Sequence, residues 1–172
     1  MCTLILAPAV WPRARLVVAA NRDELLARPA GPPALVPGPI PALAPRDLVA
    51  GGSWIGLNAA GLFVGVTNRH LRQGPSVIDP ARRSRGALVL DALACGSARD
   101  AVSRVRSFGG AAHNPFHLAL VDASDSLVIW SDGETLSEVT LEPERLHVLT
   151  ERSFGAAPSA REDGLRARFD AL

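Results

Sequence analysis

Two apolar runs at the start of the chain constrain its fold more than any other feature. The runs TLILA, from Thr3, and RLVVAA, from Arg15, flank PAVWPRA, whose two prolines end the first run and leave a connection of hairpin length. Both runs are nearly continuous in apolar residues and do not alternate with polar ones. They predict an antiparallel pair of strands that is covered on both faces.

The rest of the chain passes from strands to helices and back. A second hairpin, with glycine at its turn, precedes two helices, the second capped by Ser97; four strands and a last helix from Ala160 follow. This order predicts an α+β fold in which helices sandwich antiparallel sheets. The strand signals are SWIGLN, LFVGVTN, FHLALVD, LVIWSD, TLSEVTL and RLHVLT, and the two middle helices are expected near 86–96 and 98–108.

The segment 29–45 holds seven of the 14 prolines of the chain and shows no hydrophobic period. It predicts an extended, proline-rich loop without regular structure, and a loop of that length usually lines a site. A chain of 172 residues is long enough for one hydrophobic core, so we expect a single domain over 1–172.

Composition excludes several classes of function. The net charge of +1 gives no general attraction to nucleic acid, and all 18 basic residues are arginine, which excludes sites built on a lysine. No apolar run reaches the roughly 18 residues of a membrane span, and no secretory signal is visible, so a cytoplasmic protein is expected. The four histidines lack the ligand spacing of zinc sites, so no metal is expected.

Cys2 carries a distinct chemistry. Removal of Met1 would leave a cysteine whose thiol and free α-amine have ordinary pKa values of about 8.5 and about 7.7–8.0, close enough for the amine to act as base. The alternative is that Cys2 is only a small residue that begins a strand. Cys95 lies in the apolar run LVLDALACG and is expected to be an inert core residue.

Four strings in this order resemble the NRDE family, also called the transport and Golgi organisation family: MCTLILAP, ANRDELLARP, GGSWIGLNAAGLFVGVTNRH and RRSRGALVLDAL. The family is named after the tetrapeptide that occupies 21–24 here. It is similar in turn to N-terminal-nucleophile (Ntn) hydrolases of the choloylglycine and penicillin V amidohydrolase type. The resemblance implies an Ntn-hydrolase-like αββα four-layer sandwich with antiparallel sheets.

The resemblance also implies a site. By position, Cys2 is the nucleophile, Asp23 orients its amine and Asn21 supports Asp23, while Asn68 and Asn114 are the oxyanion donors. The amidohydrolases have an arginine directly before their Asn-x-Asp motif, whereas this chain has Ala20 there and Arg22 inside the motif. Arg22 is therefore the candidate for a cation near the thiol. Side chains beside the expected pocket are candidates for substrate binding: Trp54, Arg69, Arg82 and Arg85.

Three functions remain open on this basis. The first is a cofactor-free hydrolase in which Cys2 attacks an amide, ester or thioester. The second is a non-catalytic carrier of a lipid, an acyl group or haem on the same fold, with haem as cargo contacted by Cys2, His70 or His113. The third is a scaffolding protein. The first two imply a small-molecule ligand, and none implies a nucleic acid or a membrane span.

Overall fold

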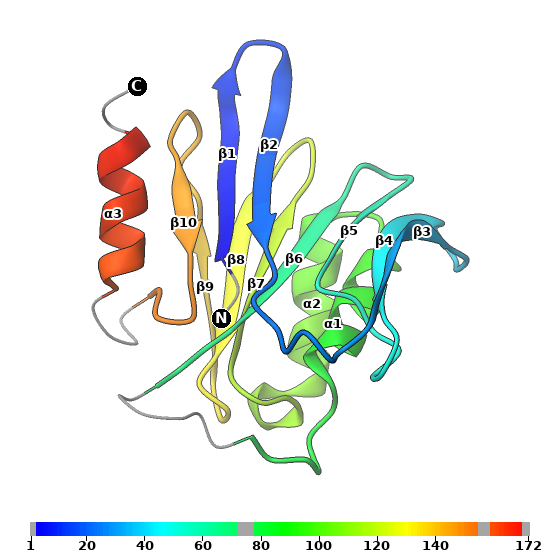
Figure 1. The fold of residues 1–172 in the computed structure, drawn as a ribbon. Coiled ribbons are helices and arrows are strands. Elements are labelled where there is room, and N and C mark those ends of the chain that lie inside the picture. Colours follow the sequence, from blue (N-terminus) through cyan, green and yellow to red (C-terminus); the bar gives the residue numbers. More distant parts are fainter. Residues whose placement is uncertain (1–2, 72–77, 155–158, 170–172) are drawn as a thin grey trace.

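Two antiparallel sheets lie face to face, with helices on their outer sides (Figure 1). The computed structural model describes residues 3–71, 78–154 and 159–169. The first sheet has the order β10–β1–β2 and the second the order β3–β4–β5–β6–β7–β8–β9, and all neighbouring strands are antiparallel. The strands are β1 Thr3–Trp11, β2 Ala14–Asn21, β3 Ala30–Val36, β4 Ala42–Asp47, β5 Ile55–Asn58, β6 Phe63–Asn68, β7 Phe116–Val121, β8 Ser126–Ser131, β9 Leu136–Thr140 and β10 His147–Leu149.

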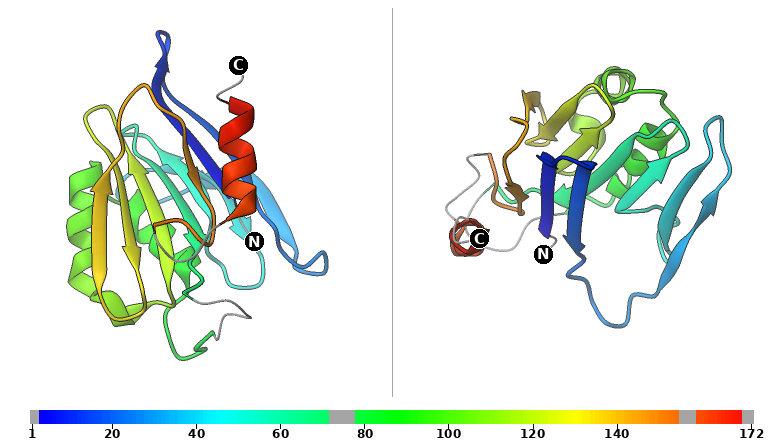
Figure 2. Two further views of the ribbon diagram at one scale, coloured as in Figure 1. Left: turned by 90° about the vertical axis from the view of Figure 1, so that its left-hand side faces the viewer. Right: turned by 90° about the horizontal axis from the view of Figure 1, so that it is seen from above.

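Helices complete the layers. Helices α1 (Arg85–Leu93) and α2 (Ala98–Phe108) cover one face of the seven-stranded sheet, and α3 (Ala160–Phe169) lies beside β10 on the other side of the molecule (Figure 2). A short 3-10 helix, Gly110–Ala112, follows α2. The α+β class and the αββα order of layers are thus confirmed, as are the hairpin β5–β6, both middle helices and the Ser97 cap, whose Oγ accepts from the Asp100 N–H.

Alternation along the strands divides the core in two. In β7 all six residues are buried, because Leu118 and Leu120 face the helices while Ala119 and Val121 face the three-stranded sheet. On the opposite sheet Leu4, Leu6 and Leu149 fill the space between the sheets. Strand β7 is therefore covered on both faces, as its continuous run of apolar residues indicates.

The first hairpin differs from its prediction in two ways. Strand β1 continues through Pro8 to Trp11, because the register shifts between these residues and Ala9 has a positive φ of 53°, so the extra residue is absorbed as a bulge. In β2 burial alternates, with Leu16 and Val18 packed inward and Val17 exposed. The prediction that both faces of β2 are covered was therefore wrong: β2 is an edge strand.

The proline-rich segment is also not the irregular loop that 29–45 predicts. It forms the hairpin β3–β4 at the edge of the seven-stranded sheet. Prolines are tolerated there because an edge strand has one side without ladder hydrogen bonds, and the register shift between Gly31 and Ala34 spans Pro32 and Pro33.

A row of leucines crosses this edge of the sheet uncovered. Leu35 pairs with Leu43, and Leu43 pairs with Leu57; their exposed fractions are 79%, 49% and 50%. The row continues through Phe63 and Val121, which are 9% and 2% exposed because the three-stranded sheet lies over them. The three-stranded sheet thus ends at β2 and leaves this face of β3, β4 and β5 without cover.

None of the α-helices in the described ranges combines the length and the apolar character needed to cross a bilayer.

Candidate functional site

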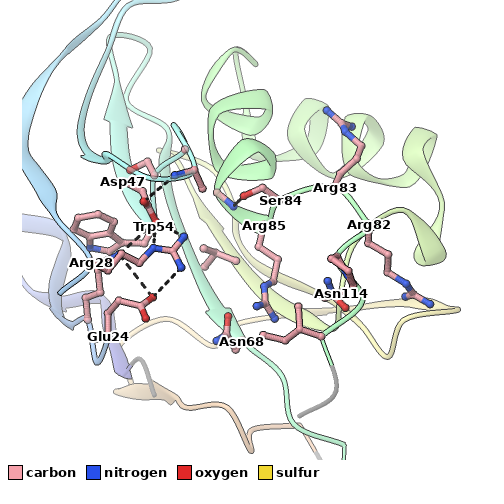
Figure 3. Close-up of a pocket in the computed structure, with 18 of the residues that line it drawn as sticks. Glu24, Arg28, Asp47, Trp54, Asn68, Arg82, Arg83, Ser84, Arg85 and Asn114 are labelled. Atoms are coloured by element: carbon pink, nitrogen blue, oxygen red, sulfur yellow. Dashed lines mark hydrogen bonds and ion pairs between the residues drawn. The ribbon is translucent and has the colours of Figure 1, made fainter. Parts of the chain in front are cut away.

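A cavity of about 390 Å³ opens where the segment after β2, the end of β6 and the start of α1 meet (Figure 3). Its wall includes Asp23, Trp54, Asn68, Arg85 and Asn114, which come from five separate segments of the chain. Five arginines and four carboxylates belong to its lining: Arg22, Arg28, Arg82, Arg83, Arg85, Asp23, Glu24, Asp47 and Asp79. Charged side chains therefore make up nearly half of the lining residues.

Asp23 is held from two sides. Asn21 Nδ2 donates to Asp23 Oδ1, and Arg161 Nη1 donates to Asp23 Oδ2 at 3.0 Å. The same Arg161 atom lies 3.1 Å from Thr3 Oγ1, and Thr3 is the register partner of Asn21. The hydrogen bond from Arg161 is the largest cause that lowers the pKa of Asp23, so the carboxylate is ionised at neutral pH.

Cys2, the predicted nucleophile, lies outside the described residues. Thr3, the next residue along the chain, is 8% exposed and begins β1 opposite Asn21. The register of β1 and β2 therefore brings the start of β1 to the end of β2, from which the Asp23 segment follows.

Arg22 faces a different wall from Asp23. Its guanidinium carbon lies 4.5 Å from the centroid of the Trp54 ring, and its Nη2 lies 3.3 Å from Asp47 Oδ2. Arg28 Nη2 also reaches Asp47 Oδ2, at 2.8 Å, and Glu24 lies 3.7 Å from both arginines. Arg22 and Trp54 thus form one side of the cavity as a stacked pair.

Asp47 anchors that wall. Burial opposes its ionisation, but hydrogen bonds from the Ala50 N–H, Arg28 and the Val49 N–H outweigh burial and lower the pKa of the carboxyl. An ionised Asp47 therefore holds both Arg22 and Arg28. Nothing in the sequence singled out Asp47, which lies 25 residues beyond Arg22.

The two predicted oxyanion donors differ in their surroundings. Asn68 ends β6 and lines the cavity, and its side-chain amide has no hydrogen-bond partner within the described residues. Asn114 is 7% exposed; its Oδ1 accepts from the Asp79 N–H and its Nδ2 donates to the Asp79 carbonyl, both at 2.9 Å. Asn68 is therefore placed to donate to a ligand, whereas Asn114 clamps the segment around Asp79.

Three arginines were expected to edge the pocket, and two of them do. Arg82 Nη1 donates to the carbonyls of Gly133 and His113 at 2.8 and 3.1 Å, and Arg85 Nη1 donates to the Pro115 carbonyl at 3.1 Å. These main-chain contacts hold both side chains at the cavity wall.

Arg69 is the exception, because it does not belong to the lining of this cavity. Successive side chains of an extended chain point to opposite sides, so Arg69 turns away from the cavity that Asn68 lines. It is 8% exposed, donates to the Phe154 carbonyl at 3.2 Å, and burial lowers the pKa of its guanidinium. Arg69 therefore fixes the turn after β10.

The start of α1 forms the floor of the cavity. Ser84 caps the helix by accepting from the Gly86 N–H, and the first turn contains no acidic residue. Gly86 packs against Gly52, whose neighbour Ser53 donates its N–H to the Gly86 carbonyl at 3.2 Å. Arg85, the first residue of α1, extends toward Asn68 in Figure 3, so an anionic group in the cavity would meet donors from both side chains.

Sequence reasoning missed Arg161 as well as Asp47. No local signal marks Arg161, because its partner Asp23 lies 138 residues away along the chain. The described residues contain no group of three or more His, Cys, Asp or Glu side chains arranged to hold a metal ion.

Comparisons with known proteins place these observations in a family. The family described as Transport and Golgi organisation 2 matches residues 1–171. No curated protein matches the chain.

Solved structures of two hydrolases are similar to it. Penicillin V acylase from Agrobacterium tumefaciens is 17% identical, with a TM-score of 0.47, and a variant of conjugated bile acid hydrolase from Clostridium perfringens is 14% identical, with a TM-score of 0.49. Each match covers 99% of this chain and 49% of the other. The chain therefore spans about half the length of these hydrolases.

Proposed function

The chain belongs to the Transport and Golgi organisation 2 family, and from this membership and the cavity we propose that it is an N-terminal cysteine hydrolase of small acyl compounds. The scissile bond would be an amide, an ester or a thioester. One observation carries the proposal: Asp23, which follows β2, and Asn68, which ends β6, line the same cavity. They are the two residues that orient an N-terminal amine and stabilise an oxyanion in the proposed reaction.

The reaction needs no cofactor. After loss of Met1, the α-amine of Cys2 takes the proton of its own thiol, and the thiolate sulfur bonds to the acyl carbon. The oxyanion that forms accepts a hydrogen bond from the Asn68 amide. Collapse of this intermediate breaks the bond to the leaving group, which takes the proton from the amine. Water then attacks the thioester and releases a carboxylic acid and the free thiol.

The residues around the cavity favour a small, polar, anionic substrate. Its arginines outnumber its carboxylates by five to four, and the side-chain amide of Asn68 adds a donor. The Arg22–Trp54 pair offers a flat surface on which a planar group can stack. A long acyl chain would have to lie against charged side chains, and desolvating them opposes binding.

The same features argue against a haem or lipid carrier. His113, a suggested haem contact, is 1% exposed and packs between Phe108 and Phe116, with ring centroids 5.9 and 6.0 Å apart. Arg82 already donates to two carbonyls. The hydrolase is therefore the better supported function.

Labelling of the two cysteines tests the proposal. Intact mass first establishes whether Met1 is removed, and iodoacetamide is then applied at neutral pH with peptide mapping of Cys2 and Cys95. Burial and the nearby Asp100 raise the pKa of the Cys95 thiol, which makes it a slow internal reference. We expect Cys2 to react about tenfold faster or more, since each unit of thiol pKa changes the thiolate fraction about tenfold.

Variants then separate catalysis from carriage. Asp23→Asn should slow labelling of Cys2, and Cys2→Ala should abolish hydrolysis of a library of small amides and thioesters. Asp125→Asn is the matched control. Asp125 forms an ion pair with Arg99 at 2.9 Å, much as Asp23 does with Arg161, but Asp125 does not belong to the cavity lining. Three results would each refute the hydrolase. The first is a protein that retains Met1, and the second is equal labelling of both cysteines. The third is a wild type that hydrolyses nothing while Cys2→Ala binds ligands as the wild type does.

A further inference from the structure

Arg161 joins the last helix to the beginning of the chain. A single guanidinium nitrogen, Nη1, donates to Thr3 Oγ1 at 3.1 Å and to Asp23 Oδ2 at 3.0 Å. Thr3 is adjacent to Cys2 in the sequence. In the proposed hydrolase mechanism, Asp23 is the carboxylate that orients the N-terminal amine. One side chain of α3 therefore contacts the residue that follows the proposed nucleophile in the sequence and the carboxylate proposed to orient its amine.

The position of Arg161 within α3 is unusual. It stands in the first turn, where the helix macrodipole disfavours a cation and favours acidic residues such as Glu162 and Asp163. An arginine there is electrostatically unfavourable for the helix alone. The contacts with Asp23 and Thr3 offset that cost.

Polar contacts dominate the attachment of α3. None of its described residues is buried, and the helix lies beside β10. Ser153 Oγ donates to Glu162 Oε2 at 2.9 Å, which fixes the residue next to Arg161 against the turn after β10. Leu165 and Phe169 are partly buried, so apolar contacts contribute, but the hydrogen bonds and ion pairs that fix the start of the helix respond to charge and salt.

We propose that Arg161 is a positioning residue, which holds the Asp23 carboxylate in the orientation that the amine of Cys2 requires. Asn21 occupies Oδ1 and Arg161 occupies Oδ2, so rotation of the carboxylate is blocked at both ends. Docking of α3 thereby becomes a condition for an activated nucleophile. This inference rests on the proposed function, since it assigns Arg161 a part in the same site.

The experiment compares Arg161→Ala and Arg161→Lys with Arg168→Ala, an exposed arginine of the same helix. The readout is the rate of Cys2 alkylation by iodoacetamide across a pH series. The Arg161–Asp23 pair is partly exposed, with side-chain exposures of 39% and 34%, so its loss should leave the fold intact. Circular dichroism and urea unfolding check that it does.

The expected result is that Arg161→Ala lowers the labelling rate about fivefold at neutral pH, as partly exposed ion pairs allow. Lysine should restore part of the rate, because an ammonium can keep one of the two contacts, and Arg168→Ala should match the wild type. In the double variant Arg161→Ala/Asp23→Asn, labelling should be no slower than in Asp23→Asn alone, because both changes act through one carboxylate.

Salt supplies a second readout. At about 1 M salt, where the Debye length is about 3 Å, the labelling rate of the wild type should approach that of Arg161→Ala, whose own rate should change little. A merely structural arginine would not give this convergence.

The outcomes separate the two proposals. If Asp23→Asn slows labelling but Arg161→Ala labels at the wild-type rate, or if the two changes are additive, the positioning role is wrong and the hydrolase stands. If Asp23→Asn itself labels like the wild type, the proposed function fails first. Nonadditive slowing with partial rescue by lysine supports both.

Discussion

Gly52 and Gly86 pack backbone against backbone: a Cβ built on Gly52 would lie 2.4 Å from the carbonyl carbon of Gly86 and 2.6 Å from its Cα. No side-chain rotation can relieve an overlap with backbone atoms. Gly52→Ala should therefore push the segment before β5 away from the start of α1 and lower the free energy of unfolding by about 2 kcal/mol or more. Urea unfolding measures this loss.

Gly38→Ala is the control for that substitution. A Cβ on Gly38 would meet only the Ile40 carbonyl oxygen, at the ordinary distance of 3.7 Å. Its effect should stay within about 1 kcal/mol and can be stabilising, because alanine restricts the unfolded chain. Equal losses in the two variants would show that the Gly52–Gly86 contact is not tight.

Asn58 ties the β5–β6 turn to the end of α1. Its Nδ2 donates to the Leu93 and Cys95 carbonyls at 2.9 and 2.8 Å, and its Oδ1 accepts from the N–H groups of Leu62 and Ala60. Asn58→Asp keeps the accepting oxygen but replaces the donating Nδ2 with a second oxygen. That oxygen would face the Leu93 and Cys95 carbonyls and be repelled by them, at a residue that is only 4% exposed. We expect a loss of about 3 kcal/mol or more at pH 7 by urea unfolding.

Acid should partly relieve the Asn58→Asp defect, because a protonated carboxyl donates one hydrogen bond. The difference in unfolding free energy between variant and wild type should therefore shrink from pH 7 to pH 4. A constant difference over this range would contradict the donor role of Nδ2.

His117 makes the stability of the fold depend on pH. It is fully buried in β7; its Nε2 donates to the Ser153 carbonyl at 3.0 Å, and its Nδ1 accepts from Thr67 Oγ1 at 3.1 Å. Burial, aided by the charge of Arg69, lowers the pKa of His117 to about 3 from an ordinary value of 6.5. Between these values the unfolded chain binds a proton that the folded chain does not, so stability falls as pH falls.

The slope of that loss can be measured. From pH 6 down to pH 4, His117 should remove about 1.4 kcal/mol of unfolding free energy per pH unit. Burial also lowers the pKa values of His113 and His70, which adds to the loss with the same sign. Urea unfolding of His117→Gln should show a smaller slope than the wild type, and an unchanged slope would mean that His117 is protonated in the folded protein.

Because the leucine row is uncovered, substitutions along this one row of the sheet should differ in their cost to the unfolding free energy. Leu43→Gln should change the unfolding free energy by no more than about 1 kcal/mol, because half of this side chain already contacts water. Phe63→Ala, two strands away under the smaller sheet, should cost about 3 kcal/mol or more. Similar costs at both positions would indicate that something covers Leu43 in solution.

Much of the fold could be predicted because its signals are local. The capping pattern at Ser97 predicts the start of α2. The glycine at position 61, which has a φ of +85°, marks the turn between β5 and β6. The strands β3 and β4 were missed because Pro32 and Pro33 dominate local propensity, whereas their pairing depends on a place at the sheet edge that only the tertiary fold provides.

The candidate site divides in the same way. Asp23, Asn68 and Trp54 were predicted because they stand in or beside recognisable strings, and all three line the cavity. Arg161 and Asp47 were not, since their partners are distant in sequence and an isolated arginine or aspartate gives no signal. Arg69 directly follows Asn68, so the alternation of an extended chain sends the two side chains to opposite sides, and only Asn68 lines the cavity.

The place of β1 between β2 and β10 has a consequence for the order of events during synthesis. Leu4 pairs with Leu149 on one side and with Ala20 on the other, so the first strand cannot complete its sheet until nearly the whole chain has left the ribosome. Throughout that interval the side of β1 that faces β10 carries unpaired main-chain N–H and C=O groups. The first strand to be made thus keeps one open edge through most of translation, and β10 closes it only after every strand of the larger sheet has been synthesised.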